Sequence, residues 1–167
     1  MNSSDGHIPS ITLRDVQPRD LDAFFAYQND PQACAMAMVK PRTREVFQTV
    51  WEKVFQERQN RDSGIVAKAI LADDELCGSI GCHRRGELLA AGYMVGRPFW
   101  GRGIASRALT LFLVEVTRRP LHAWAAASNL ASLRILQKNG FAVLDCKPSA
   151  ETERFVACDE VHLVLEA

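Results

Sequence analysis

Apolar positions change their spacing along the chain, and these changes predict a domain of both helices and strands. Apolar residues recur every three or four positions in segments 21–28, 43–55, 103–117 and 129–139, which is the period of an amphipathic helix. Shorter apolar runs bounded by turn residues predict strands. The predicted strands are 11–16, 65–71, 76–83, 88–95, 121–126, 141–146 and 161–165.

The predicted elements follow the order β-α-α-β-β-β-α-β-α-β-β and form one domain. No repeat, linker or low-complexity tract divides residues 1–167, and this length suits a single core. Residues 1–9 are polar and are expected to be a loose start. The first helix is expected to stop near Asn29-Asp30-Pro31, because proline interrupts a helix. The fold class is therefore α/β, more specifically α+β.

Composition and charge exclude several classes of function. Lys and Arg number 20, as do Asp and Glu, so no net field attracts nucleic acid or an anionic membrane. The longest apolar run, 109–114, is too short to cross a membrane, and no leader pattern opens the chain. The five cysteines form no Cys-x-x-Cys pair, so we expect reduced, mostly buried thiols and no metal site. These features predict a soluble cytoplasmic protein.

The stretch GRPFWGRGIASRAL, residues 96–109, carries the strongest chemical signal. Gly101, Gly103 and Ala105 lie between a predicted strand and a helix start. Such a start presents unpaired backbone N–H groups and the positive end of the helix dipole, both of which favour a phosphate. Nearby arginines would add charge. From these residues alone, a plain tight turn explains the stretch equally well.

Two phosphate-binding motifs fit the stretch poorly. A Walker-type loop requires a Gly-Lys-Ser/Thr ending, which is absent. A dinucleotide fingerprint requires a third glycine, where this chain has Ser106. That fingerprint also requires an acid about twenty residues further on, and Arg118-Arg119 lie near that position.

Two motifs together resemble the GNAT (general N-acetyltransferase) superfamily. The first is Tyr93-Met94-Val95 followed by Trp100-Gly101-Arg102-Gly103-Ile104-Ala105, which resembles the acyl-CoA loop of that family. The second is Asn129-Leu130-Ala131-Ser132 followed by Gln137-Lys138-Asn139-Gly140-Phe141. The specific match covers residues 88–145, with looser similarity elsewhere. The branch that acetylates ribosomal-protein N-termini is the most similar.

The resemblance implies a mostly antiparallel mixed sheet, flanked by helices, that splays apart between the fourth strand, 88–95, and the fifth, 121–126. Acetyl-CoA, as cosubstrate, would bind in the gap, with its pantetheine arm paired to exposed backbone groups of Met94 and Val95. Arg134 or Lys138 would meet its adenosine end, although a solvated helix face explains these two equally well. The implied cofactor-binding residues are Tyr93, Met94, Val95, Trp100, Gly101, Arg102, Gly103, Ile104, Ala105, Ser106, Asn129 and Ser132.

The implied chemistry is direct attack of a primary amine on the thioester. The N–H of Val95 would stabilise the oxyanion. Leu136 stands where many relatives carry a tyrosine that protonates the thiolate, so Ser132 is the candidate donor. The alternative for Ser132 is a first-turn serine that bonds a helix N–H.

The general base is less clearly marked. Ala90 stands where many relatives have glutamate, which leaves His83 and Glu87 as candidates, with His122 and Asp159 also within reach. Each of the first two is otherwise a surface group at a hairpin end. The missing carboxylate favours an acceptor with a low pKa, such as an α-amine.

The acceptor itself is a peptide or protein N-terminus, an amino acid or a small amine. The apolar stretch 33–38 lies where the family's acceptor groove tends to be, although core packing explains it equally well. A non-catalytic acyl-CoA-binding sensor is the main rival function, and nucleotide binding is a weaker one. The resemblance also allows a homodimer.

Overall fold

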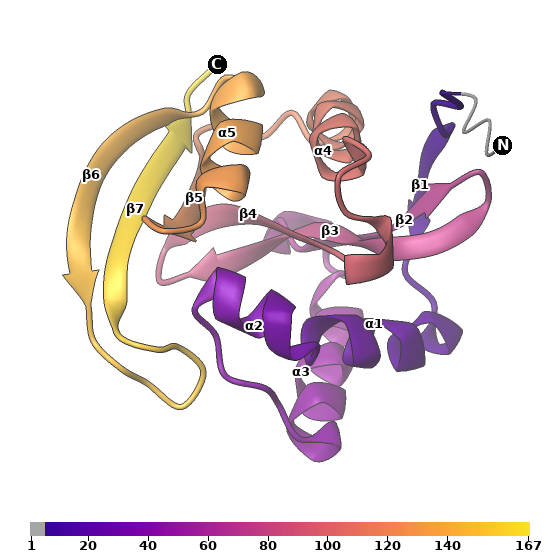
Figure 1. The fold of residues 1–167 in the computed structure, drawn as a ribbon, viewed down its shortest axis with the longest axis horizontal. Helices are drawn as coiled ribbons and strands as arrows, with labels where there is room; N and C mark the ends of the chain where they lie inside the picture. Colours follow the sequence, from indigo (N-terminus) through magenta and orange to yellow (C-terminus); the bar gives the residue numbers. More distant parts are fainter. Residues whose placement is uncertain (1–5) are drawn as a thin grey trace, which may run out of the picture.

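A seven-stranded mixed sheet organises the molecule (Figure 1). The computed structural model describes residues 6–167. The strands are β1 (Ile11–Asp15), β2 (Val66–Ala72), β3 (Glu75–Arg85), β4 (Leu88–Val95), β5 (Leu121–Ala126), β6 (Ala142–Ser149) and β7 (Cys158–Leu165). The helices are α1 (Leu21–Gln28), α2 (Pro31–Ala37), α3 (Arg44–Glu57), α4 (Ile104–Glu115) and α5 (Leu130–Lys138), with short 3-10 turns at Pro18–Asp20, Arg61–Ser63 and Arg97–Phe99.

The sheet opens in its middle. Its order is β1-β2-β3-β4-β5-β7-β6, and every neighbouring pair is antiparallel except β4 and β5. The parallel pair shares a single register position, Ala90 opposite His122. Beyond it the two strands separate, so the far end of β4 has a free edge. The expected α+β fold and its splay between the fourth and fifth strands are confirmed.

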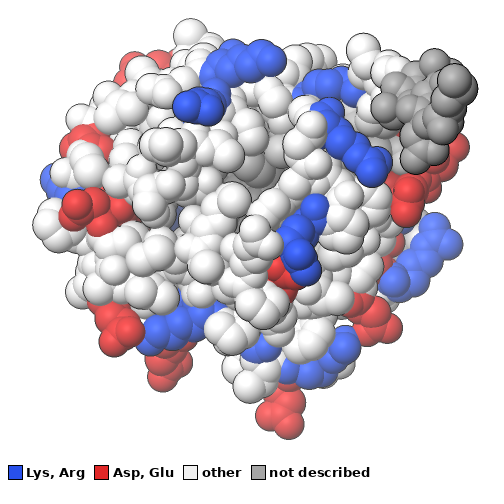
Figure 2. Space-filling model, in the orientation of Figure 1, with Lys and Arg blue, Asp and Glu red and all other residues white. Residues whose placement is uncertain are grey.

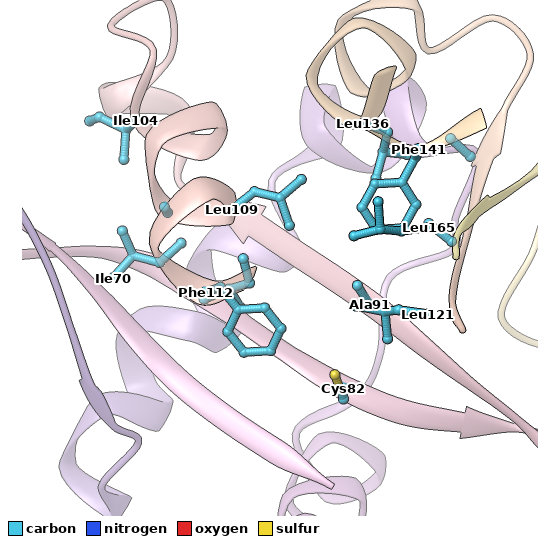
Figure 3. Packing of buried hydrophobic residues seen from close by; sticks show 14 of the residues in the cluster. Ile70, Cys82, Ala91, Ile104, Leu109, Phe112, Leu121, Leu136, Phe141 and Leu165 are labelled. Carbon is cyan, nitrogen blue, oxygen red and sulfur yellow. The ribbon is translucent and has the colours of Figure 1, made fainter. Parts of the chain in front are cut away.

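Helices cover both faces of the sheet and build two apolar clusters. α4 and α5 lie on one face, and α1, α2 and α3 lie on the other (Figure 1). Leu109 and Phe112 of α4 are buried in one cluster with Ile70 and Cys82 of the sheet, and the Phe112 ring points toward Cys82 (Figure 3). Leu136 of α5 is buried in the same cluster. The second cluster forms between α1, α3 and the opposite face of β2.

Helix α2 was not expected from the sequence. Asp30 lies just before it, and its carboxylate accepts hydrogen bonds from the N–H groups of Gln32 (3.0 Å) and Ala33 (3.1 Å). Pro31 occupies the first helical position, where the missing N–H costs nothing. The prediction that Pro31 only ends a helix was therefore incomplete, because this proline also begins the next one.

The N-terminal expectation lies partly outside the described residues, which begin after residue 5. Within them, His7 Nε2 lies 2.6 Å from a carboxylate oxygen of Asp73, and the N–H of Ser10 donates to the same carboxylate at 2.9 Å. His7 and Ser10 therefore contact the β2–β3 turn through Asp73. None of the described helices is long and apolar enough to span a bilayer.

The cysteines are all free thiols. Cys34, Cys77 and Cys82 are buried, Cys158 is half-buried and Cys146 is exposed. Burial raises the pKa of Cys77 to about 11 and that of Cys82 to about 12. The buried thiols therefore stay protonated at neutral pH and act as small apolar side chains.

Candidate active site

A cavity of about 660 Å³ occupies the gap where β5 leaves β4. Its walls come from both faces of the sheet: α4 and α5 on one side, α2 on the other. Figure 2 views the molecule from the cavity side, and the centre of this face is hollowed and largely uncharged, with Lys and Arg along its upper margin. The volume is in the range typical of sites for small molecules and cofactors.

The start of α4 supplies a cluster of free donors to one end of the cavity. Within residues 6–167, no backbone N–H from 101 to 106 donates a hydrogen bond, and the first paired amide is that of Arg107. Gly103 caps the helix without a side chain, at a φ of 69°. A Cβ placed on Gly103 would have no atom within 4 Å, so the space beside the backbone is open. These features fit a diphosphate.

Val95 presents a further free donor where β4 ends. The N–H of Gly96 donates to the carbonyl of Cys77 at 2.8 Å, which marks that pair as hydrogen-bonded. Antiparallel pairs alternate, so Val95, opposite Gly78, directs its N–H and C=O away from β3 and into the gap. Consistently, the Val95 carbonyl accepts from Trp100 Nε1 at 2.7 Å.

The same alternation corrects one expected detail about Met94. Its backbone groups face β3, opposite Ser79, so Met94 has no free backbone donor or acceptor at the gap, although it lines the cavity. Tyr93 and Val95 are the residues whose backbone groups face the gap. The ligand arm would therefore meet alternate residues of β4.

Tyr93 and Ser132 form a hydrogen-bonded pair in the cavity wall. The Tyr93 hydroxyl lies 2.8 Å from Ser132 Oγ and 3.2 Å from the Ser132 carbonyl oxygen. Burial raises the pKa of Tyr93 to about 12, so the phenol keeps its proton at neutral pH. Asn129 caps α5 by accepting from the Ser132 N–H at 3.2 Å, and its own NH2 makes no hydrogen bond in the described chain.

His83 is the candidate base that reaches the cavity. It lies near the end of β3, and its ring packs beside Gly92, where a Cβ would be 3.4 Å from Cε1. The His83 side chain is exposed at the cavity mouth, and partial desolvation lowers its pKa, with the positive charge of Arg85 lowering it further. The imidazole is therefore neutral at pH 7 and able to accept a proton.

The structure places the other candidate bases elsewhere. β3 extends to Arg85, so Glu87 lies in the following turn, exposed and outside the cavity lining. His122 is buried, and its Nδ1 lies 2.8 Å from His162 Nε2, away from the cavity. Asp159 is exposed on β7 and also lies outside the lining. These three positions offer no group to a substrate in the cavity.

The cavity brings together all but one of the expected cofactor-binding residues. Arg102 is the exception, since its guanidinium lies 6.0 Å from the ring centre of Phe99 instead. Arg134 and Lys138 of α5 also lie outside the lining. The cavity residues among those expected are Tyr93, Met94, Val95, Trp100, Gly101, Gly103, Ile104, Ala105, Ser106, Asn129 and Ser132.

The end of the cavity away from α4 contains polar residues that were not predicted from the sequence. From the expected stretch 33–38, Ala33, Met36 and Ala37 line the wall, whereas Cys34 packs inward. Arg42 and Arg154 line the same end and were not anticipated. No local motif marks them, because they meet only through long-range packing.

Comparison with known proteins identifies the class of domain that this open sheet and amide cluster define. The family model for the acetyltransferase (GNAT) domain matches residues 10–142. An uncharacterised N-acetyltransferase, p20 of Bacillus licheniformis, is 26% identical over 146 residues, which cover 78% of each chain. The chain therefore belongs to the GNAT family, and it is an acetyl-CoA-dependent N-acetyltransferase.

Solved structures support the same fold at lower identity. One is the Salmonella typhimurium acetyltransferase that modifies the N-terminal serine of ribosomal protein L7/L12: 17% identical, TM-score 0.75, covering 96% of this chain and 98% of that one. Another is Mycobacterium smegmatis RimJ in complex with CoA disulfide: 22% identical, TM-score 0.72, covering 94% and 82%. The expected similarity to ribosomal-protein acetyltransferases is confirmed.

Proposed function

We propose that the chain transfers an acetyl group from acetyl-CoA to a primary amine by direct attack in this cavity. The observation that carries the proposal is a pair of free donor sites in one cavity: the amides of residues 101–106 and the N–H of Val95. Such a pair suits a ligand with a diphosphate at one end and a thioester at the other. The acceptor class includes a peptide N-terminus, an amino acid and a small amine.

Binding of the cosubstrate uses mostly backbone. The amides at the start of α4 hold the diphosphate, with the helix dipole adding positive potential. The gap-facing backbone groups of Tyr93 pair with the amide-containing arm as a missing strand would. The Val95 N–H is left for the thioester, because the Val95 carbonyl already accepts from Trp100. The free NH2 of Asn129 donates to the same arm from the α5 side. Because backbone groups make most of these contacts, a substitution that adds a Cβ should weaken CoA binding more than one that removes a charge.

Four residues in the cavity wall have roles in the transfer step. As the amine nitrogen bonds to the carbonyl carbon, the Val95 N–H stabilises the charge on the oxygen. His83 accepts the proton that the amine loses. When the carbon–sulfur bond breaks, Ser132 donates its hydroxyl proton to the thiolate, and Tyr93 orients and replenishes that hydroxyl.

Thiol release from acetyl-CoA tests this function. Purified protein is offered amines, amino acids and N-terminal peptides, and each product is identified by the added acetyl group in its mass. The proposal expects thiol release that depends on an acceptor and falls in Ser132→Ala and His83→Gln. Saturable CoA binding without acceptor-dependent release from any of these would instead favour a sensor.

A further inference from the structure

Two arginines, Arg42 and Arg154, line the end of the cavity that lies away from α4. Arg42 follows α2 in the chain, whereas Arg154 lies in the loop between β6 and β7. That loop lies on the α2 side of the sheet, while α4 covers the other face (Figure 1). Both arginines line the same cavity as His83.

The backbones that carry the two arginines are firmly held. Asn29 accepts from the N–H of Arg42 at 3.0 Å and donates to its carbonyl at 2.7 Å. The β6–β7 loop joins the segment after α2 through the bonds Lys40 N–H to the Arg154 carbonyl (2.7 Å) and Val156 N–H to the Met38 carbonyl (2.9 Å). A guanidinium nitrogen of Arg154 also donates to the Lys40 carbonyl. Two long-separated segments therefore form one rigid wall.

Neither guanidinium has an anionic partner among residues 6–167. Two acidic groups on the adjoining segments are engaged elsewhere: Glu151 lies 3.2 Å from Lys40 Nζ, and Asp30 lies 2.9 Å from Arg97 Nε. Desolvation lowers the pKa of both arginines, and the charge of Arg42 helps to lower that of Arg154 to about 10. The two positive charges therefore repel each other in a partly desolvated wall. A bound anion would reduce this repulsion.

A third donor lies in the same wall. The Nε2 atom of Gln28 is buried and has no hydrogen-bond partner in the described chain. A buried donor of this kind costs free energy unless a ligand or water pairs with it. Around these donors the wall is apolar, with Met36 and Phe155 among its residues. The site therefore offers unpaired N–H groups surrounded by carbon.

We propose that Arg42 and Arg154 form a subsite for a carboxylate carried by the acceptor amine. This proposal rests on the function proposed above. The flat fork of each guanidinium matches the two oxygens of a carboxylate, and Gln28 adds a donor beside them. The acceptor is then an amine that also carries a carboxylate: a free amino acid, or a peptide N-terminus with an acidic side chain nearby. A polyamine would be repelled.

Matched acceptors measure the charge preference. Each carboxylate acceptor is paired with its amide: a free amino acid against the amino acid amide, and Asp-containing against Asn-containing peptides with blocked C-termini. The carboxylate should exceed its amide by about ten- to hundredfold in kcat/KM, because charged hydrogen bonds are at stake. The two pairs distinguish an α-carboxylate from a side-chain carboxylate.

Variants that remove the charge of Arg42 or Arg154 test whether these two residues cause the preference for carboxylate acceptors. Arg42→Gln and Arg154→Gln should bring the carboxylate-to-amide ratio of kcat/KM close to one, chiefly by lowering the value for the carboxylate. Arg154→Lys keeps the positive charge and a donor for the Lys40 carbonyl. It should therefore keep the fold and part of the preference for the carboxylate acceptor. Exposed Arg61→Gln is the matched control and should behave as wild type. A wild-type ratio near one, or a ratio that survives in both glutamine variants, overturns the subsite.

Equilibrium binding separates this inference from the proposed function. Calorimetry on CoA-loaded protein compares an N-acetylated acid, the reaction product, with its amide. If the acid binds through Arg42 and Arg154 but no acceptor is ever acetylated, the subsite stands and the catalytic proposal falls. If the glutamine variants instead weaken CoA itself, the two arginines bind the cosubstrate and the inference is wrong.

Discussion

Replacing Gly103 with alanine separates the ligand-binding role of the α4 start from its backbone conformation. Gly103 has a φ of 69°, and a Cβ there would meet no protein atom within 4 Å. Alanine in the left-handed region costs about 1–2 kcal/mol. For a chain of this size, that corresponds to a melting temperature lower by about 2–8 °C.

Gly86 provides the matched control. It has a φ of 61°, also has no atom within 4 Å of its Cβ position, and lies in the β3–β4 turn outside the cavity. Gly86→Ala and Gly103→Ala should therefore lose similar stability in thermal or urea unfolding.

Only Gly103→Ala should weaken CoA binding, by about ten- to hundredfold in Kd, because its Cβ keeps the diphosphate from the amides. Calorimetry with CoA measures that difference directly. Equal CoA affinity in the two variants would refute the assignment of the diphosphate to this loop.

Four further substitutions test other parts of the account. Ser132→Ala should lower kcat by about a hundredfold with little change in KM, because a proton donor is lost only in the transition state. Tyr93→Phe should lower kcat by about fivefold, as expected for one hydrogen bond, and an equal rise in KM would instead indicate a packing role. His83→Gln should lower kcat/KM by about a hundredfold and remove the rise in rate that wild type shows as pH increases through the lowered pKa of His83. Asp20→Asn should cost about 2–4 kcal/mol in urea unfolding at pH 7, because the buried carboxylate accepts two bonds from Arg14. Burial raises the pKa of Asp20, but Arg14 and the Gln17 N–H lower it overall, so this cost should shrink as pH falls below about 4.

The local signals in the sequence were sufficient for most of the sheet and for the diphosphate end of the cavity. Strands β4 and β5 have the predicted bounds, because their apolar runs end at clear turn residues. The amide cluster at α4 was also predictable, since glycines directly before a helix create it locally.

Features that depend on long-range packing were not predictable in the same way. Helix α2 was missed because Pro31 ends one helix and begins another, and only the Asp30 cap distinguishes the two. Glu87 was placed too near the site because β3 runs two residues beyond its predicted end, to Arg85. Arg154 joins the acceptor end through a loop more than a hundred residues away from Arg42, and no spacing in the sequence indicates that contact.

The pairing of Tyr93 with Ser132 illustrates both cases. Each residue was expected at the site from its own motif, but their contact requires α5 to pack against β4. The sequence therefore identified the parts, and the packing decides that one hydroxyl supports the other.

Amide hydrogen exchange at residues 101–106 tests the central claim most directly. These N–H groups have no partner in the described chain, so they should exchange rapidly in the free protein. Saturating acetyl-CoA should slow exchange there and at Val95, while the Gly86 turn stays unchanged. Acetyl-CoA binding that leaves residues 101–106 unprotected would contradict the account.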